Sequence, residues 1–222
     1  MIELSGVSKD YLVGQSKVHA VSDVSFEIAK GEFAAIAGPS GSGKSTLLNL
    51  IGGIERPSAG RLLVDGQSIG ELTPDQSALM RRAKMGFIFQ TFNLLPVFTA
   101  YENVEYPLHL LNVPNEERRR RVDALLKEVG MSERADHKPS QLSGGQRQRV
   151  AIARALAAQP SVVLADEPTA NLDHQTADEI IALMKKLHQD HGVTIIFSTH
   201  DPRIIEQANR LIRLDSGRLA TA

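Results

Sequence analysis

The first part of the chain contains stretches in which apolar and polar residues alternate. Residues 24–28, VSFEI, alternate in this way, and Ile2 and Leu4 follow the same period near the start of the chain. A period of two is typical of a strand that buries one of its faces. We therefore expect antiparallel β-structure at the N-terminal edge of the fold.

Four other stretches are apolar without alternation. They are residues 33–37, 86–89, 162–165 and 193–197, and each is bounded by turns or polar residues. Continuous apolar runs of this length are expected for strands that are covered on both faces, as in parallel sheets flanked by helices. The first run leads through a glycine-rich loop into a helical stretch at 46–51. The pattern therefore predicts an α/β fold with a parallel sheet.

Helical periodicity dominates the middle of the chain. Residues 115–129 and 144–158 give helical patterns with no strand pattern between them. We expect residues 91–158 to form a helical subdomain. Residues 1–90 and 159–222 would form the core with its antiparallel edge, and the whole chain, 1–222, would be a single domain.

The last third of the chain adds a helix and a hairpin. Residues 176–190 place Ala177, Ile180, Ile181, Met184 and Leu187 on one helical face. The stretch LIRLDSGRL at 211–219 contains a Ser-Gly turn between apolar residues, which predicts a β-hairpin.

Composition narrows the possible functions. The 222 residues contain 25 Lys and Arg against 26 Asp and Glu, so the formal net charge of −1 gives no general reason to expect a nucleic-acid partner. The absence of cysteine excludes disulfides and thiolate metal sites. The chain shows no signal-peptide pattern, and its apolar runs are far shorter than the ~20 residues of a spanning helix. We therefore expect that it does not cross a membrane by itself.

The loop after the first apolar run reads GPSGSGKST and fills every fixed position of the pattern G-x-x-x-x-G-K-[ST]. Between a strand and a helix, this pattern indicates a phosphate-binding loop. Its glycines let the backbone wrap around phosphates, Lys44 reaches the terminal phosphates, and Ser45 ligates Mg²⁺. The alternative is a glycine-rich turn that happens to carry a lysine. The expected ATP contacts are Gly38, Pro39, Ser40, Gly41, Ser42, Gly43, Lys44, Ser45 and Thr46.

Two adjacent carboxylates follow the run VVLA at 162–165. Ligands of parallel sheets bind at the carboxyl ends of the strands, so Asp166 and Glu167 are expected at such an edge. Asp166 would hold Mg²⁺, and Glu167 would act as general base by accepting a proton from the attacking water. The alternative is a charged pair that only caps the end of a strand.

Three further side chains are candidates by position. His200 follows the last buried strand, on the same rim as Asp166, and would sense the γ-phosphate, although a lone histidine is more often structural. Gln90 ends the strand at 86–89 and would complete the metal shell through its amide oxygen, although an isolated glutamine is normally surface. Tyr11 would stack on adenine or simply pack against its neighbours.

A second glycine-containing helix start lies at QLSGGQRQRVAIARAL, residues 141–156. A serine hydroxyl, glycine N–H groups and a helix dipole can together bind an anion, although a helix cap without a ligand has the same appearance. The phosphate loop lies far upstream. The residues alone therefore leave open which phosphate Ser143, Gly144 and Gly145 serve.

These motifs together resemble the nucleotide-binding domains of ABC transporters. Tyr11, the phosphate loop, Gln90, LSGGQ at 142–146, LADEP at 164–168, NLD at 171–173 and His200 occur in that family's order and spacing. The resemblance covers essentially the whole chain, and the LSGGQ signature is the family's own. It implies a P-loop NTPase fold of the ABC ATPase type with a RecA-like parallel-sheet core, an N-terminal antiparallel β-subdomain and a helical subdomain.

The resemblance also implies how ATP and Mg²⁺ are used. In the family, two domains pair head to tail, and the signature of one faces the ATP held by the phosphate loop of the other. A homodimer on ATP binding, with both of its sites active, is therefore expected. The residues expected to act on the partner's ATP are Leu142, Ser143, Gly144, Gly145, Gln146 and Asp173.

Within the family, the chain looks most similar to the ATPases of macrolide-exporting, lipoprotein-releasing and related cell-division systems. This similarity implies a separate integral-membrane permease, and a peripheral location on the inner face of the cytoplasmic membrane reached through that permease. The permease would export a substrate or extract lipoproteins or lipids. Residues 91–106, apolar beside Gln90, would form the groove for its coupling helix or simply belong to the subdomain core.

Other functions stay open at this point. An ATPase of the same type that regulates a cell-wall hydrolase or division complex is the main alternative. A soluble ABC ATPase of DNA repair or translation is disfavoured, because such chains usually carry two cassettes or long coiled coils. A small-molecule kinase is disfavoured because the signature has no role in one. The basic run at 118–121 is interpreted as a solvated helix face without a ligand.

Overall fold

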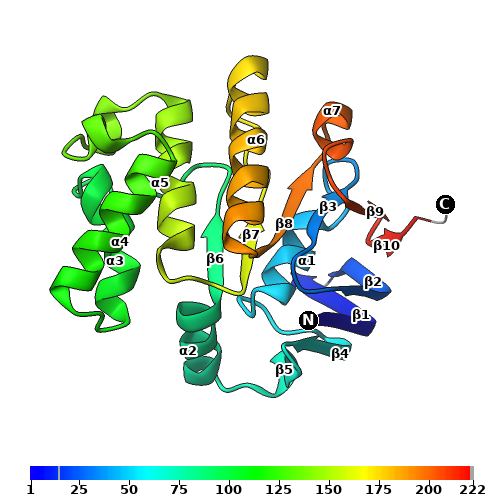
Figure 1. Ribbon diagram of the computed structural model, residues 1–222. Helices are drawn as coiled ribbons and strands as arrows, with labels where there is room; N and C mark the ends of the chain where they lie inside the picture. Colours follow the sequence, from blue (N-terminus) through cyan, green and yellow to red (C-terminus); the bar gives the residue numbers. More distant parts are fainter. Residues whose placement is uncertain (15, 221–222) are drawn as a thin grey trace. The chain divides into compact units, whose positions relative to one another are not determined.

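The computed structural model describes residues 1–14 and 16–220 and contains two compact units (Figure 1). The first unit comprises residues 1–81 together with 194–222, and the second comprises residues 82–193. The chain therefore leaves the first unit after about a third of its length and returns to it at the end. The subdomain boundaries expected from the sequence stay a prediction.

An antiparallel sheet forms the N-terminal part of the first unit. Its strand order is β2-β1-β4-β5, and Ile2 lies opposite Ile28 while Leu4 lies opposite Phe26. Ile2, Leu4 and Ile28 are buried, as the alternation predicts for one face of a strand. The antiparallel edge is thus confirmed, and its strands extend well beyond residues 24–28. The strands are β1 (Ile2–Val13), β2 (Ser16–Ile28), β4 (Ala59–Val64) and β5 (Gln67–Ser68).

Parallel strands form the centre of the first unit. β3 lies between β8 and β9 and runs parallel to both, and β10 closes an antiparallel hairpin with β9. Every residue of β3 and β8 is buried, and the rings of Phe33 and Phe197 pack 5.0 Å apart between these strands. The strands predicted from the apolar runs at 33–37 and 193–197 and the C-terminal hairpin are therefore confirmed. The strands are β3 (Phe33–Ala37), β8 (Thr194–Thr199), β9 (Arg210–Asp215) and β10 (Arg218–Leu219).

The helices of the first unit are short. Helix α1 packs beside β2 and β8 and begins two residues before the predicted helical stretch. The boundary between the units falls in the last turn of α2. The helical segments are α1 (Lys44–Ile51), η1 (Ile69–Glu71), α2 (Pro74–Lys84) and α7 (Pro202–Ile205).

The second unit packs helices on a pair of parallel strands, β6 (Met85–Ile88) and β7 (Val162–Ala165). Gly86 lets α5 approach β6 closely, because a Cβ atom at this position would lie only 2.3 Å from the carbonyl oxygen of Ala155. Residues 91–158 are all described, and they contain helices and no strand, as expected. The helical segments are α3 (Ala100–Leu110), α4 (Asn115–Glu128), η2 (Ser132–Arg134), η3 (Pro139–Gln141), α5 (Gly144–Ala157) and α6 (His174–His191).

Helices α3, α4 and α5 pack against one another in this unit (Figure 1). In α6, the five apolar residues predicted to share a face are all buried. The helix is therefore amphipathic, as its sequence indicates. Over residues 1–14 and 16–220, the structure contains no helix with the length and apolar character that a bilayer crossing requires.

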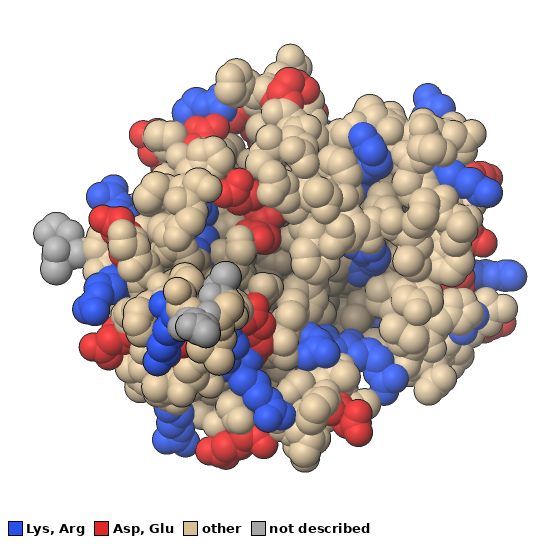
Figure 2. Space-filling model, turned by 180° about the vertical axis from the view of Figure 1, so that it is seen from behind, with Lys and Arg blue, Asp and Glu red and all other residues tan. Residues whose placement is uncertain are grey.

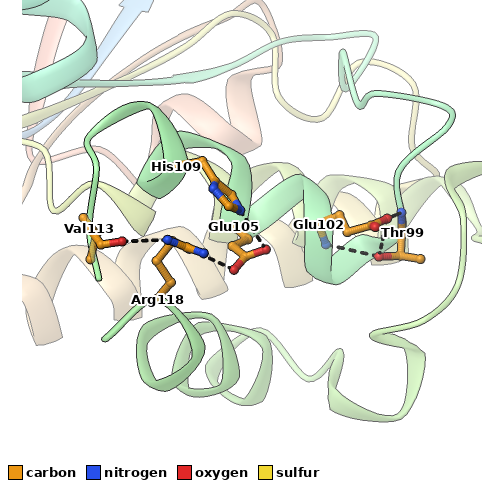
Figure 3. A network of polar contacts seen from close by, with 6 residues as sticks. All are labelled: Thr99, Glu102, Glu105, His109, Val113 and Arg118. Atoms are coloured by element: carbon orange, nitrogen blue, oxygen red, sulfur yellow. Dashed lines mark hydrogen bonds and ion pairs between the residues drawn. The ribbon is translucent and has the colours of Figure 1, made fainter. Parts of the chain in front are cut away.

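A polar link joins α3 to the start of α4 (Figure 3). The Glu105 carboxylate accepts a hydrogen bond of 3.0 Å from Arg118 Nε and lies 3.3 Å from His109 Nε2. Arg118 also donates to the carbonyl oxygen of Val113 at 2.7 Å. Arg118 is therefore partly buried and holds the two helices together, whereas Arg119 and Arg120 of the same basic run are exposed.

Candidate functional site

The loop between β3 and α1 has a backbone that requires glycine at specific positions. Gly41 and Gly43 have φ angles of 78° and 98°, which L-residues rarely adopt. A Cβ atom on Gly43 would lie 2.3 Å from the carbonyl oxygen of Ala20. The buried side chain of Lys44 folds back over the loop and donates to the carbonyl oxygens of Gly38 at 2.9 Å and Pro39 at 3.0 Å. The lysine thus brings a positive charge to the loop interior.

This loop also presents polar groups suited to an anion. The buried hydroxyl of Ser42 has no hydrogen-bond partner among the described residues. No described side chain caps the N-terminus of α1, where the first backbone N–H groups lack helical partners. A phosphate group supplies the acceptor oxygens that such donors need. The residues of the loop therefore fit the phosphates of a nucleotide.

Tyr11 lies near the end of this loop. Its hydroxyl donates to Glu55 at 2.6 Å and is hydrogen-bonded to Thr46, while Lys9 Nζ lies 5.2 Å from the centre of its ring. Burial, and then the hydrogen bond to Glu55, raises the pKa of Tyr11. The ring is thus fixed beside the loop from which Thr46 comes. Glu55, which has no part in the sequence motifs, anchors it.

His200 lies at the same edge of the first unit as the phosphate loop. In the parallel register, Ala37 at the end of β3 pairs with Thr199 at the end of β8, so Gly38 and His200 leave adjacent strand ends. Both residues line a cavity of about 570 Å³, together with Pro39 and residues of β9 and α7. The exposed imidazole of His200 is therefore close to the phosphate loop. Its expected place on the same rim as Asp166 stays a prediction.

The second unit carries the paired carboxylates. Asp166 and Glu167 follow β7, and Asp166 N donates to the carbonyl oxygen of Ile88 at the end of β6 at 2.9 Å. Gln90 follows the same end of β6 and is exposed. Glu167 has a φ angle of 43°, a conformation that costs about 1–3 kcal/mol for a residue other than glycine. Such strain often occurs at functional sites, and here it fixes the direction in which the Glu167 side chain leaves the backbone.

The signature residues begin α5 with a complete capping box. Ser143 Oγ accepts a hydrogen bond from Gln146 N at 3.3 Å, and the Gln146 side chain accepts one from Ser143 N at 3.0 Å. Leu142 is buried beneath this turn. The first turn of α5 is therefore held by the protein's own side chains.

Leu172 and the first turn of α6 pack against the two signature glycines. A Cβ atom on Gly144 would lie 3.2 Å from Leu172 Cδ2, and one on Gly145 would lie 2.6 Å from Thr176 Cγ2. Asp173 caps α6 by accepting hydrogen bonds from Thr176 N at 3.0 Å and from Thr176 Oγ1 at 2.7 Å. These two bonds lower the pKa of Asp173. The signature and Asp173 are thus brought together.

Side chains outside the predicted set connect these elements. Asn171 Nδ2 donates to the carbonyl oxygen of Gln90 at 2.9 Å, and the buried Gln148 of α5 donates to the carbonyl oxygen of Pro168 at 2.6 Å. Arg154 of α5 donates to the carbonyl oxygens of Phe92 and Asn93. No local pattern in one sequence identifies such contacts, because they join segments 20 or more residues apart.

The candidate residues therefore fall into two groups. Tyr11, the loop 38–46 and His200 belong to the first unit. The second unit contains Gln90, Asp166, Glu167, residues 142–146 and Asp173. Within each group the residues lie on adjacent strand ends or on contacting loops, apart from Tyr11, which lies within β1.

Comparison with known sequences places this geometry in context. The sequence profile of the ABC transporter family matches residues 21–170. An ABC transporter ATP-binding protein of Thermotoga maritima is 48% identical over 219 residues, which cover 99% of this chain and 93% of that protein. The macrolide export ATP-binding/permease protein MacB of Syntrophobacter fumaroxidans is 47% identical over 98% of this chain and 31% of MacB. The chain thus spans about a third of the length of that relative.

Solved structures agree with the sequence comparison. The dimeric ATP-binding cassette MJ0796 in a post-hydrolysis state bound to ADP and Pi has a TM-score of 0.92 and 44% identity, covering 100% of this chain and 97% of that chain. MJ0796 is an ABC transporter ATP-binding protein of Methanocaldococcus jannaschii. The agreement confirms the fold class predicted from the sequence.

Proposed function

Because the chain belongs to the ABC transporter family of ATPases, we propose that it is the subunit whose ATP hydrolysis drives a separate membrane permease. One observation carries the proposal. A phosphate loop suited to anion binding and a capped LSGGQ helix start occur in the same chain. The first binds a nucleotide, and the second is the feature by which the family acts on the nucleotide of another copy.

The first unit binds ATP. Backbone N–H groups of residues 38–46 and the start of α1 receive the phosphates, and Lys44 turns from the loop carbonyls toward the terminal phosphate oxygens. Tyr11, held by Glu55, offers its ring to the adenine. His200 hydrogen-bonds the γ-phosphate from the end of β8.

Three side chains are the proposed metal ligands. Ser45, Gln90 and Asp166 offer a hydroxyl, an amide oxygen and a carboxylate, which are the hard oxygen donors that Mg²⁺ prefers. Mg²⁺ supplies charge neutralisation at the β- and γ-phosphates when it is bound. The position of Asp166 is fixed by the bond from its N–H to Ile88, so its carboxylate leaves the strand end in a defined direction.

Glu167 removes the proton from the attacking water. Its backbone conformation, with φ at 43°, belongs to the turn after β7 and sets the direction of the Cα–Cβ bond from which the carboxylate extends. A general base contributes about 10²–10⁴-fold to the rate. The proton passes from water to the Glu167 carboxylate as the water oxygen bonds to the γ-phosphorus and the bond to the ADP oxygen breaks.

Two copies of the chain pair head to tail around ATP. Ser143, Gly144 and Gly145 of one copy then face the γ-phosphate held by the phosphate loop of the other. The dimeric state of MJ0796, bound to ADP and Pi and 44% identical to this chain, supports this arrangement. Leu142 and Gln146 support the first turn of α5. Asp173, which is joined to the signature through Thr176, changes position when the signature contacts the partner's nucleotide.

The permease contacts the region after Gln90. Val97, Tyr106 and Leu110 are exposed apolar residues in or next to α3, with exposed fractions of 70, 41 and 43%. The ATP-binding/permease proteins named MacB, about three times longer than their match to this chain, support a permease of that type as the partner. The chain would then act at the inner face of the cytoplasmic membrane through this partner.

A nucleic-acid partner is not part of the proposal. Lys and Arg side chains lie among Asp and Glu side chains on the face shown in Figure 2. Binding to phosphate backbones requires clustered positive charge. Among the expected roles, the similarity to the macrolide export protein MacB supports export over control of a cell-wall hydrolase.

Affinity purification of the chain from solubilised native membranes tests the proposal. The wild type should co-purify with an integral-membrane protein. Val97→Glu should no longer co-purify with this protein, while its own ATPase rate is unchanged. Leu12→Glu, which changes an 81% exposed leucine of β1, is the matched control and should still recover the permease. Recovery of no membrane protein by the wild type, or equal recovery by Val97→Glu, would contradict the proposal.

A further inference from the structure

The chain reverses immediately after Gln90 through two left-handed residues. Phe92 and Asn93 have φ angles of 63° and 47°. Asparagine tolerates this region, but a bulky residue such as phenylalanine enters it only when its surroundings compensate for the strain. The turn at 92–93 therefore needs a partner that stabilises it.

Arg154 of α5 is that partner. Its Nη1 donates to the carbonyl oxygen of Asn93 at 2.5 Å, and its Nη2 donates to the carbonyl oxygen of Phe92 at 3.0 Å. The planar guanidinium thus holds two consecutive carbonyls at once, which the single ammonium group of a lysine cannot match in geometry. The partly buried side chain makes both bonds across about 60 residues of sequence.

The ring of Phe92 contacts the signature end of the same helix. The ring centre lies 4.8 Å from the guanidinium carbon of Arg147, which is a cation–π contact. Phe92 is buried, and a Cβ atom on Gly144 would lie 4.0 Å from its Cζ atom. The turn after Gln90 is therefore attached to α5 at two places, by its backbone to Arg154 and by its ring to the first turn.

A third contact holds Gln90 from the other side. Asn171 donates to the carbonyl oxygen of Gln90, and the next residue, Leu172, lies against Gly144. Gln90 thus lies between a turn and a loop that both contact α5. Its backbone cannot move independently of the signature without breaking these bonds.

We propose that Arg154 is a positioning residue, which fixes the 92–93 turn so that Gln90 and the signature move as one rigid piece. The inference rests on the proposed role of Gln90 as a metal ligand. It goes beyond that role by naming the side chain through which a movement of the signature helix would displace the Gln90 amide. Arg154 does not contact substrate in this account and acts only through Gln90.

Arg154→Lys tests this inference, because it keeps a positive charge and loses the two-pronged contact. We expect the Mg²⁺ concentration for half-maximal ATPase to rise, or kcat to fall, by about 10–100-fold, as for other residues that support a metal ligand. Affinity for ATP without metal should not change. The matched control is Arg149→Lys, on the same helix, which loses comparable bonds to Val129 and Glu179 and should leave both quantities unchanged.

A double-mutant cycle with Gln90→Ala separates positioning from general stability. If Arg154 acts through Gln90, Arg154→Lys has no further effect on kcat or Mg²⁺ dependence in the Gln90→Ala background. Amide hydrogen exchange at residues 91–94 should accelerate in Arg154→Lys and not in Arg149→Lys. Hydrogen exchange reports on the stability of the turn even if the rate of ATP hydrolysis is too low to measure.

The outcomes distinguish the inference from the proposed function. Suppose that Gln90→Ala lowers the ATPase rate, and that Arg154→Lys lowers the rate of Gln90→Ala by the same factor as it lowers the parent rate. The metal role of Gln90 then stands, and the positioning role of Arg154 is overturned. Unchanged exchange at residues 91–94 in Arg154→Lys overturns it as well. If Gln90→Ala has the parent rate and Mg²⁺ dependence, the metal role itself fails, and the inference falls with it.

Discussion

Helices α1 and α5 both begin in glycine-containing loops, but their first turns are stabilised differently. The N-cap of α1 is Gly43 in a left-handed conformation, and no described side chain caps this helix. The N-cap of α5 is Ser143, which forms a complete capping box with Gln146. The donors at the start of α1 thus lack a capping acceptor, whereas the start of α5 is complete without a ligand.

This difference matches the two proposed roles. A loop that must enclose phosphates benefits from uncapped N–H groups and from a lysine that folds over it. A helix start that must meet another copy's nucleotide benefits from a fixed shape before the encounter, because rigidity lowers the entropy lost on binding. The cap of a glycine-containing helix start therefore indicates whether its N–H groups are available to a ligand.

The largest expected effect is on the rate of ATP hydrolysis, without an effect on ATP binding. Glu167→Gln should lower the rate of ATP hydrolysis by about 10²–10⁴-fold, because the amide cannot accept the proton of the attacking water. ATP binding, which we propose for the first unit, should be unchanged. Single-turnover hydrolysis and equilibrium ATP binding check this, with Glu179→Gln, a partner of Arg149, as the control that keeps the rate. Full activity of Glu167→Gln would exclude the general-base role.

The next effect tests the phosphate loop. Lys44→Ala should weaken ATP binding by roughly 10–100-fold, because a hydrogen bond to a charged group contributes about 1.5–3 kcal/mol. Fluorescent-nucleotide titration of the single chain measures this loss. In the same assay, Ser143→Arg should bind the nucleotide with the affinity of the parent. Equal losses in the two variants would mean that the signature contributes to binding within one chain, against the account.

A smaller effect concerns packing behind the signature. The new methyl group of Gly145→Ala would lie 2.6 Å from Thr176 Cγ2, and Thr176 cannot turn away without losing its bond to Asp173. Overpacking of this kind costs about 1–3 kcal/mol. Denaturant unfolding should show this loss, and Thr176→Ser, which removes Cγ2 and keeps the hydroxyl, should restore stability in the double variant.

A matched variant completes that test. The closest atom to the new methyl group of Gly144→Ala is the terminal methyl group of Leu172, at 3.2 Å, so this variant should lose less free energy of unfolding than Gly145→Ala. If Thr176→Ser fails to rescue Gly145→Ala, the destabilisation does not come from this contact.

The smallest effect compares two capping boxes of the second unit. Thr99 and Glu102 form one at the start of α3 (Figure 3), and Ser143 and Gln146 form the other. Thr99→Ala and Ser143→Ala should each lower the free energy of unfolding by about 1 kcal/mol. Only Ser143→Ala should also slow ATP hydrolysis, because of these two residues only Ser143 is proposed to contact a nucleotide. Equal rates in the two variants would reduce Ser143 to a helix cap.

The sequence predicts most of the strands because burial on both faces leaves a continuous apolar run. The bounds of β3 and β7 agree with residues 33–37 and 162–165. The pattern predicts no individual helix at α2 or α3, although α3 lies within the expected helical subdomain. In α2 only Ser77 and Met80 are buried, and in α3 the interior Pro107 obscures the periodicity, although the T-x-x-E capping pattern at Thr99 was a visible signal.

The candidate site was predictable where motifs specify it and not elsewhere. The phosphate loop and the signature are local patterns with a fixed spacing, so one sequence contains them fully. Glu55, Asn171 and Arg154 act through contacts with residues 44, 81 and 61 positions away. Tertiary packing creates these contacts, and one sequence gives no local sign of them.

The central claim is that ATP is hydrolysed only between two copies of the chain, with the phosphate loop of one facing the signature of the other. The ATPase rate per chain, measured at saturating ATP while the protein is diluted from micromolar concentrations downward, tests it most directly. We expect the rate per chain to fall toward zero on dilution, as pairs separate. A rate per chain that stays constant throughout the dilution would contradict it.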